Sequence, residues 1–176
     1  MSIPHALLAL LNERPNFGLR LQQEFEESTG AIWPLNVGQV YTTLQRLERD
    51  GYVALDDDDA RGRRAVYQIT DSGRGELVEW LHTPPAIDSP PRDELVIKVL
   101  VALRVPDVDV HDVIQAHRRR LIESMQRYTQ IKANADEEDV ELSLVVDAQI
   151  FRLEGVVRWL DAADVRLKLS QQGGRV

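Results

Sequence analysis

The sequence is 176 residues long, carries a net charge of −8 and contains no cysteine, which excludes disulfides and cysteine-based metal or redox sites. Its 43% hydrophobic and 28% charged residues are typical of a soluble globular protein with material for one large or two small domains. No segment resembles a signal peptide or is long enough to span a bilayer, so we expect a soluble cytoplasmic protein.

The first 35 residues predict two helices and a connection. Apolar side chains recur with helical spacing over residues 3–12. Asn16 is a candidate N-cap for a second helix over residues 17–28, which buries Phe17, Leu21 and Phe25 on one side. Residues 29–35 then lead into a third helix.

The third helix, over residues 36–51, is the one around which the rest is arranged. Asn36 can cap its N-terminus, and Gly51 stands where a left-handed C-terminal residue is favoured. Its two faces differ: the apolar stripe is Val40, Leu44 and Leu47, and the polar or cationic face is Gln39, Thr42, Thr43, Arg46 and Arg49. A DNA major groove accepts such a helix, although many surface helices share the pattern. Three short helices in this order indicate a helix-turn-helix whose third member reads DNA.

A β-hairpin is predicted next. Residues 52–55 and 65–70 are rich in β-branched and aromatic side chains, and a polar segment containing Gly62 separates them. A hairpin directly after a reading helix is the wing of a winged helix-turn-helix. Its arginines can reach phosphates or a minor groove, or they can simply neutralise the acidic run at residues 56–59. These arginines are Arg61, Arg63 and Arg64.

A proline-rich segment predicts the domain boundary. Thr70 can cap a fourth helix over residues 71–82, and four of the eight prolines follow within residues 84–91, which a helix cannot cross. We therefore predict four parts: a winged helix-turn-helix at 1–83, a linker at 84–91, a helical dimerisation domain at 92–170 and a flexible tail at 171–176.

The second domain is predicted to be entirely helical. Residues 92–105 indicate a helix buried on most of its surface, and residues 110–134 and 141–169 indicate two long antiparallel helices. The last helix has more apolar positions than one seam needs, and such a surplus usually covers a partner, so we predict a homodimer. The predicted contact residues are Leu142, Val146, Leu153, Val157, Leu160 and Leu167. The fold class is thus mainly α, with a β-hairpin wing and a C-terminal long-helix domain.

Several runs together resemble the PadR family of bacterial transcription regulators. In the first domain these are residues 6–11 (Ala-Leu-Leu-Ala-Leu-Leu), 17–21 (Phe-Gly-Leu-Arg-Leu), 37–48 (Val-Gly-Gln-Val-Tyr-Thr-Thr-Leu-Gln-Arg-Leu-Glu), 51–53 (Gly-Tyr-Val), 63–70 (Arg-Arg-Ala-Val-Tyr-Gln-Ile-Thr) and 72–73 (Ser-Gly). Residues 92–95 (Arg-Asp-Glu-Leu) with Lys98 resemble the start of the C-terminal domain in longer-tailed members. One departure is that Phe17-Gly18 stands where the family usually has Gly-Tyr.

The resemblance implies a homodimeric repressor that binds a palindromic double-stranded operator. It implies that Tyr41 contacts the DNA backbone, whereas its place beside the apolar stripe equally fits a core residue. Some relatives respond to phenolic or other flat hydrophobic molecules, which implies an effector pocket between the reading domain and the dimer helices. Trp33, Trp80 or Trp159 would line it, and a position in the core is the alternative for each of the three. The predicted DNA contacts are Gln39, Tyr41, Thr42, Thr43, Arg46, Arg61, Arg63 and Arg64.

The sequence predicts no enzyme activity, no metal and no cofactor. It has no nucleophile elbow and no phosphate-binding glycine loop. The acidic run at residues 57–59 fails as an EF-hand because Arg61 and Gln68 stand where oxygen ligands are required. His111 and His117 lie on different faces of one helix, and no third metal ligand is evident.

The charge of the chain keeps a second interpretation open. Residues 1–82 hold 8 basic and 13 acidic side chains, and residues 83–176 hold 13 and 16, so neither half is basic. Contact with DNA must therefore come from locally clustered arginines. The alternative is a winged-helix adaptor that uses the same face to bind a protein and does not bind DNA.

Overall fold

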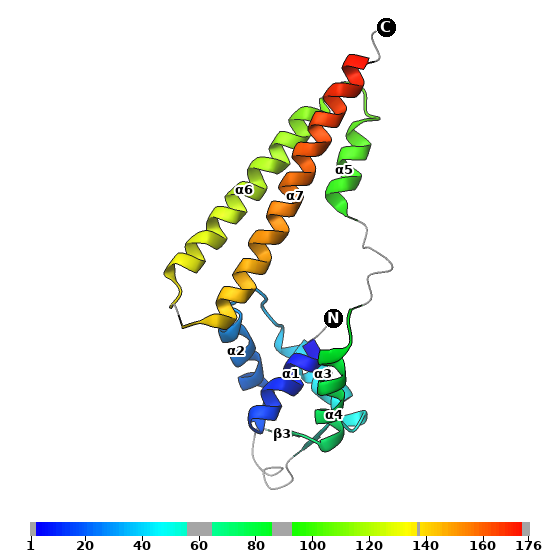
Figure 1. The fold of residues 1–176 in the computed structure, drawn as a ribbon. Coiled ribbons are helices and arrows are strands. Elements are labelled where there is room, and N and C mark those ends of the chain that lie inside the picture. The colour runs from blue at the N-terminus through cyan, green and yellow to red at the C-terminus, as the bar shows by residue number, and fades with distance from the viewer. Residues whose placement is uncertain (1–2, 56–64, 86–92, 137, 174–176) are drawn as a thin grey trace. The chain divides into compact units, whose positions relative to one another are not determined.

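A computed structural model describes residues 3–55, 65–85, 93–136 and 138–173, without the side chains of 171–173. The chain divides into two compact units, Met1–Ile87 and Asp88–Val176. The first combines helices with a small sheet and the second is helical in its described part (Figure 1). The predicted fold class, a winged helix-turn-helix followed by a helical domain, is confirmed.

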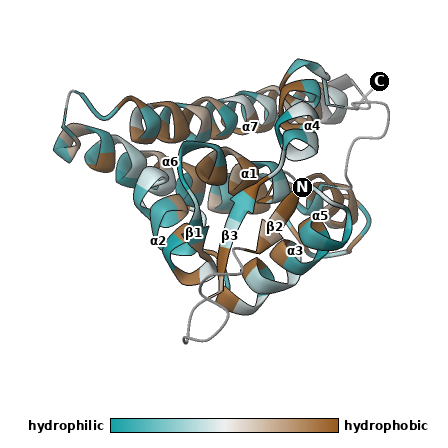
Figure 2. Cartoon of the chain, turned by 90° about the horizontal axis from the view of Figure 1, so that it is seen from below, coloured by the Kyte–Doolittle hydropathy of each residue, from teal (hydrophilic) through white to brown (hydrophobic). Residues whose placement is uncertain are grey.

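The first unit is a winged helix. Its elements, in chain order, are α1 (Ile3–Glu13), β1 (Asn16–Phe17), α2 (Gly18–Ser28), α3 (Val37–Arg49), β2 (Val53–Leu55), β3 (Val66–Ile69) and α4 (Asp71–His82). The antiparallel sheet has the order β1-β3-β2, with Val53 opposite Ile69, and Figure 2 shows the three strands side by side. Both predicted wing strands are present, and β1 is an additional strand that the sequence pattern did not indicate.

The core of this unit forms where the apolar faces of α1, α2 and α3 meet. Each fully buried leucine there stabilises the fold by roughly 1.5–3 kcal/mol relative to an exposed one. The side chains with no exposed surface are Leu7, Leu8, Leu21, Val40 and Leu44. The predicted stripe of the third helix is therefore a core element, which fixes which side of α3 faces outward.

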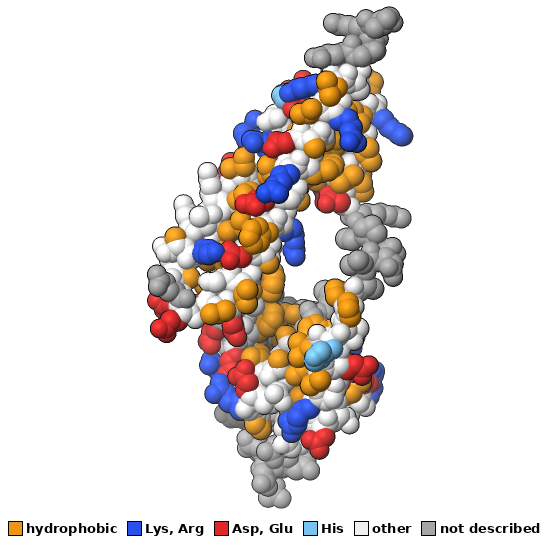
Figure 3. All heavy atoms as spheres, in the orientation of Figure 1, with side chains coloured by type: hydrophobic (Ala, Val, Ile, Leu, Met, Phe, Trp, Pro, Cys, Tyr) orange, Lys and Arg blue, Asp and Glu red, His pale blue; other side chains and the backbone are white. Residues whose placement is uncertain are grey.

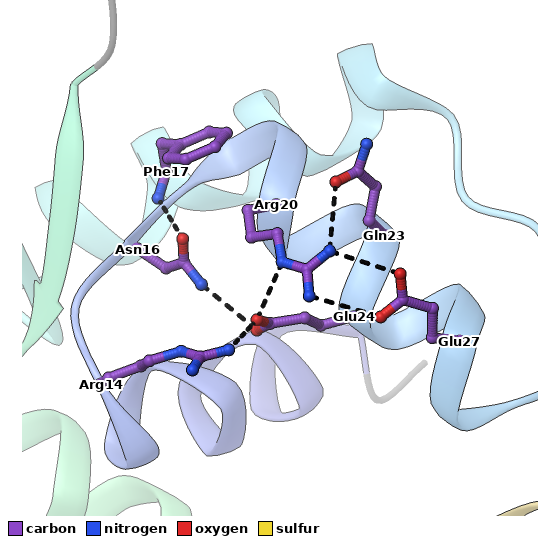
Figure 4. Close-up of polar contacts among 7 residues, drawn as sticks. All are labelled: Arg14, Asn16, Phe17, Arg20, Gln23, Glu24 and Glu27. Atoms are coloured by element: carbon purple, nitrogen blue, oxygen red, sulfur yellow. Dashed lines mark hydrogen bonds and ion pairs between the residues drawn. The ribbon is translucent and has the colours of Figure 1, made fainter.

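The prediction that Asn16 caps α2 is wrong. Asn16 is a buried residue of β1 and lies opposite Tyr67 of β3. Its Oδ1 accepts from the Phe17 backbone N–H (3.1 Å), and its amide donates to Glu24 (3.2 Å), as Figure 4 shows. Phe17 takes the N-cap position instead and makes no side-chain capping bond. Pairing of β1 with β3 thus decides where α2 begins.

The second unit contains three helices in its described part: α5 (Glu94–Ala102), α6 (Val110–Asn134) and α7 (Val140–Gly173). The long helices α6 and α7 run antiparallel and pack along their length (Figure 1). The core cluster at one end of the pair consists of Val99, Ala102, Val110, Ile114 and Leu160. No helix in the described ranges is long and apolar enough to cross a membrane.

Helix α5 is less buried than its sequence suggests. Only Val99 and Ala102 are buried among its residues, and Leu100 and Val101 are more than half exposed. The prediction of a helix buried on most of its surface is therefore wrong. An apolar run shows that a helix has several apolar faces, but only one face of α5 packs against α6.

The predicted dimer contacts need a similar correction. Val146 and Leu160 have no exposed surface in the single chain, so they are part of its own core and out of reach of a second chain. The other four, Leu142, Leu153, Val157 and Leu167, are half-buried. The homodimer itself stays a prediction at this point.

A buried carboxylate joins the two long helices. Asp164 of α7 is 9% exposed; its Oδ1 lies 2.6 Å from Nδ1 of His111, and its Oδ2 accepts from Lys168 Nζ at 2.8 Å. The hydrogen bonds from Lys168 and from His111 lower the pKa of the Asp164 carboxyl below its usual value. The ionised carboxylate therefore stabilises this unit.

Candidate nucleic-acid interface

Helix α3 is capped at both ends by local interactions that the sequence predicts. Asn36 Oδ1 accepts from the Gly38 backbone N–H at 2.7 Å. At the other end Gly51 has a φ of +79°, its N–H donates to Glu48 O (3.0 Å), and the N–H of Tyr52 donates to Leu47 O (2.8 Å). This pair of bonds is the Schellman motif. The caps define where α3 begins and ends.

The polar face of α3 points away from the core of its unit. Gln39, Thr42 and Arg46 are exposed and Thr43 is half-buried, while the apolar stripe behind them is fully covered. Their orientation therefore suits contact with an external partner. Contact with DNA itself stays a prediction for these residues.

The two threonine hydroxyls already donate to the helix. Thr42 Oγ1 donates to Gly38 O and Thr43 Oγ1 donates to Gln39 O, each at 2.8 Å. A partner therefore meets an oxygen that accepts a hydrogen bond, together with a methyl group. Amino groups of adenine or cytosine and the thymine methyl have the matching chemistry.

Tyr41 lies outside the core, but its side chain is held in contact with a neighbouring helix. It is 37% exposed, and its ring lies against the first residue of α2. A Cβ added to Gly18 would lie 2.8 Å from Tyr41 Cε1 and 3.0 Å from Cζ, so only glycine leaves room for the ring in this position. Sequence reasoning noticed Phe17-Gly18 only as a departure from the family pattern. In the structure, Gly18 leaves the space in which the Tyr41 ring lies beside the polar face of α3.

Arg46 is the cation of α3 that remains available. Arg49 is engaged by Asp50, with Nε to Oδ1 at 2.8 Å, and this hydrogen bond lowers the pKa of the Asp50 carboxyl. Within the described ranges Arg46 has no ion pair, although its charge also contributes to lowering the pKa of Asp50. An exposed, unpaired guanidinium on a helix face is the group that phosphates and guanine edges bind best.

The cations of α2 and its neighbourhood are already neutralised. Arg14 and Arg20 both bind Glu24, and Arg20 also reaches Glu27, with Nε to Glu24 Oε1 at 3.1 Å (Figure 4). This network ties the turn before β1 to α2. It leaves α3, rather than α2, as the cationic surface of the described unit. The predicted wing contacts Arg61, Arg63 and Arg64 lie outside the described residues.

The first unit also contains an apolar cavity of about 480 Å³. It lies between α1, α2, α4 and the connection before α3, and Phe25, Trp33 and Trp80 line it. The ring of His5 stacks on Trp80 (centroids 4.5 Å apart, planes 8° apart), and His5 Nε2 lies 3.0 Å from Glu76 Oε1. Two of the three predicted pocket tryptophans thus line one cavity, whereas Trp159 packs against the core of the second unit.

Comparison with known proteins gives matches along nearly the whole chain. Residues 7–79 match the model of the "Transcriptional regulator PadR-like family", and residues 91–168 match that of "Virulence activator alpha C-term". A Mycobacterium tuberculosis protein named "Probable transcriptional regulator Rv1176c" is 30% identical over 92% of this chain and 95% of its own. The "Negative transcriptional regulator PadR" of Bacillus subtilis is 23% identical over 91% of this chain and 94% of its own.

Solved structures of Bacillus subtilis PadR have the same fold. The complex with operator DNA has a TM-score of 0.69 at 20% identity and covers 94% of this chain and 99% of that one. The complex with p-coumaric acid has a TM-score of 0.72 at 21% identity, and the match covers 96% of this chain and 99% of that one.

Proposed function

Since this chain belongs to the PadR-like family of transcriptional regulators, we propose that it is a repressor that binds a palindromic operator as a homodimer and is released by a small aromatic effector. Its place of action is the cytoplasm. Two reading helices, one from each protomer, enter successive major grooves about 34 Å apart along the duplex. The Bacillus subtilis relative is named a negative regulator, and its structure with operator DNA supports this proposal.

The observation that carries the proposal is the outward face of α3. Gln39, Thr42 and Arg46 are exposed on it, and Arg46 has no ion pair among the described residues. In this assignment Arg46 binds a phosphate or a guanine edge, while the threonine oxygen and methyl contact neighbouring bases. Tyr41, held against Gly18, contacts the backbone beside them.

The rival is a winged-helix adaptor that binds protein with this face, and the net charge of −8 favours it. Salt dependence separates the two. An interface that displaces counterions from phosphates loses affinity steeply as salt rises. The logarithm of the association constant falls against the logarithm of the salt concentration with a slope of about −0.9 per neutralised phosphate. Absent or salt-insensitive DNA binding, together with a stable protein partner, would favour the adaptor.

The test begins with protection mapping of the DNA upstream of the protein's own gene, followed by affinity measurements on the protected duplex at several salt concentrations. Arg46→Ala is expected to weaken binding roughly 5- to 150-fold if Arg46 reads a base, or to reduce the salt slope by about one if it binds a phosphate. Arg49→Ala is the matched control, since Arg49 is engaged by Asp50 on the same helix. An unchanged affinity in Arg46→Ala, with unchanged oligomeric mass, removes Arg46 from the interface.

We assign the effector to the cavity between α1, α2 and α4. Its volume of about 480 Å³ and its aromatic lining suit a flat molecule of the size of a hydroxycinnamic acid. The Bacillus subtilis relative has been solved with p-coumaric acid, which belongs to this class. An effector that prefers one arrangement of the reading helices shifts the population without any chemical step.

The effector assignment is tested with p-coumaric acid as the probe. Trp33 and Trp80 line the cavity, so binding is expected to quench tryptophan fluorescence and to lower operator affinity over the same concentration range. Trp33→Leu is expected to weaken both effects. If Trp33→Leu bound the acid as tightly as the unmodified chain and still released DNA, the effector site would lie elsewhere.

A further inference from the structure

The apolar cavity of the first unit contains one side chain that can accept a hydrogen bond, the imidazole of His5. The other described residues that line it are alkyl side chains, the ring of Phe25 and the indoles of Trp33 and Trp80, whose N–H groups only donate. Neither a lysine nor an arginine is among them. Figure 3 shows apolar side chains gathered around a histidine on the visible face of this unit. The chemistry of His5 therefore decides which polar group of a ligand the cavity can bind.

A contact outside the cavity determines which nitrogen of His5 carries the proton. His5 Nε2 lies 3.0 Å from Glu76 Oε1. A carboxylate only accepts hydrogen bonds, so Nε2 of the neutral imidazole carries the proton and donates it. Nδ1 is then left with a lone pair and can only accept. The stacking of the imidazole on the Trp80 ring, with 4.5 Å between the centroids, supports this orientation.

Nδ1 of His5 is a buried acceptor without a partner in the described part of the chain. Solvent does not reach the atom, and no described residue donates a hydrogen bond to it. The whole side chain is 18% exposed. An unpaired polar atom in the interior is costly, and native proteins contain few of them. Because neighbouring atoms cover Nδ1, the wall of the cavity has to adjust slightly when the donor group of a ligand pairs with it.

We propose that this cavity binds a neutral phenol, whose hydroxyl donates to Nδ1 of His5 and whose ring packs among the aromatic side chains of the lining. The inference rests on the effector cavity of the proposed function and names the ligand group that it recognises. A carboxylate does not fit the same place, because it has no proton to give to Nδ1 and would be buried without a cation. A phenolic acid therefore enters with its hydroxyl first and keeps its carboxylate toward solvent.

His5 also connects the cavity with helix α3. A second pocket of about 210 Å³ lies between α1, α3 and α4, and Arg46 and Glu76 are among its lining residues. His5 is the one described residue that lines both this pocket and the apolar cavity. A ligand that moves the imidazole therefore also moves the partner of its Nε2, the Glu76 carboxylate. Glu76 shares the second pocket with Arg46, so occupancy of the cavity reaches the proposed DNA contact through one side chain.

A matched pair of ligands tests the hydrogen bond. The hydroxyl of 4-ethylphenol can donate, whereas 4-ethylanisole, its methyl ether, has no proton to give. In calorimetric titrations of the full chain the phenol is expected to bind roughly 5-fold or more tightly than the ether, because the ether leaves Nδ1 unpaired. The phenol is also expected to lower operator affinity over the same concentration range. Equal affinities for the two ligands, or no measurable binding of the phenol, would overturn the assignment.

Two substitutions of His5 separate recognition of the ligand from its effect on DNA binding. His5→Asn keeps an oxygen acceptor near the position of Nδ1 but loses the contact with Glu76. His5→Gln keeps a donor that can reach Glu76 but has no acceptor at the position of Nδ1. The preference for the phenol should survive in His5→Asn and disappear in His5→Gln, and release of the operator by the phenol should weaken in His5→Asn. Both variants lose the stacking on Trp80, so each controls for that loss in the other.

Failure of this inference can be told apart from failure of the proposed function. Ligand affinities are measured on the chain alone, and operator affinity is first measured without ligand. A chain that prefers the phenol but binds no operator contradicts the proposed function and leaves recognition by His5 in place. A chain that binds its operator but does not distinguish the phenol from the ether overturns this inference alone. A preference that persists in His5→Gln would also overturn it, because the acceptor would then be another group.

Discussion

Replacing Gly73 by alanine probes the close approach of α4 to Tyr52, the residue before β2. A Cβ added to Gly73 would lie 2.1 Å from the backbone oxygen of Tyr52 and 2.8 Å from Ile69 Cγ1. The carbonyl cannot easily turn away, because it accepts a hydrogen bond from the Thr70 N–H at 3.0 Å. The substitution must therefore push α4 away from the start of β2.

The size of the effect follows from three contributions. Forcing a methyl group into a packed site costs about 1–3 kcal/mol, and weakening the bond between Thr70 and Tyr52 costs about 1 kcal/mol more. Alanine returns about 1 kcal/mol through its helix propensity, so we expect a net loss of about 2 kcal/mol. Gly75 lies two residues later in α4 and has no neighbouring atom within 4 Å of an added Cβ, so Gly75→Ala should raise stability by about 0.5–1 kcal/mol.

Urea unfolding of the full-length chain, followed by tryptophan fluorescence, measures both changes. Gly73→Ala should shift the midpoint of the first unit to lower urea, and Gly75→Ala should shift it slightly upward with the same slope. Operator affinity of Gly73→Ala measured well below the midpoint should also fall, since β2 follows the reading helix. If the two variants changed stability equally, the close approach at Gly73 would be refuted.

Two further predictions concern other contacts. Gly18→Ala should displace the Tyr41 ring and weaken operator binding, and a double-mutant cycle with Tyr41→Ala should be strongly non-additive; additive losses would separate the two residues. The lowered pKa of Asp164 means that its contribution to stability is fully present above about pH 5 and is lost as the pH falls through 3.8 toward the folded-state value. Asp164→Asn should therefore be less stable than the unmodified chain near pH 7, with a difference that shrinks in acid unfolding curves; a difference independent of pH would contradict this.

Local signals in the sequence predict most of the first unit. The caps of α3 at Asn36 and Gly51 and the cap of α4 at Thr70 depend on residues within a few positions, and the structure confirms all three. The second wing strand alternates strongly enough to be recognised, and the first is indicated by the change of pattern after Gly51. The outward direction of Arg46 follows from the buried stripe on the other side of the same helix.

What the sequence could not predict depends on contacts between distant segments. Strand β1 is two residues long and exists only because Asn16 and Phe17 pair with β3. The contact between Gly18 and Tyr41 joins residues on two successive helices, α2 and α3, and depends on how these helices pack against each other. In α7, helical periodicity identifies apolar faces but does not say which face its own unit covers. Val146 and Leu160 were therefore predicted on the partner surface although they belong to the protomer core.

Thr70 connects the elements that meet where the β2–β3 hairpin begins and ends. The Thr70 hydroxyl donates to Gly51 O (2.7 Å), its N–H donates to Tyr52 O (3.0 Å), and its oxygen accepts from the Gly73 N–H (3.0 Å). Thr70 thereby links the end of α3, the two strands β2 and β3, and the start of α4. We expect insertions or deletions between Leu55 and Ala65 to leave the angle of α3 unchanged. Under the proposed function, such changes would leave the major-groove contact of α3 in place.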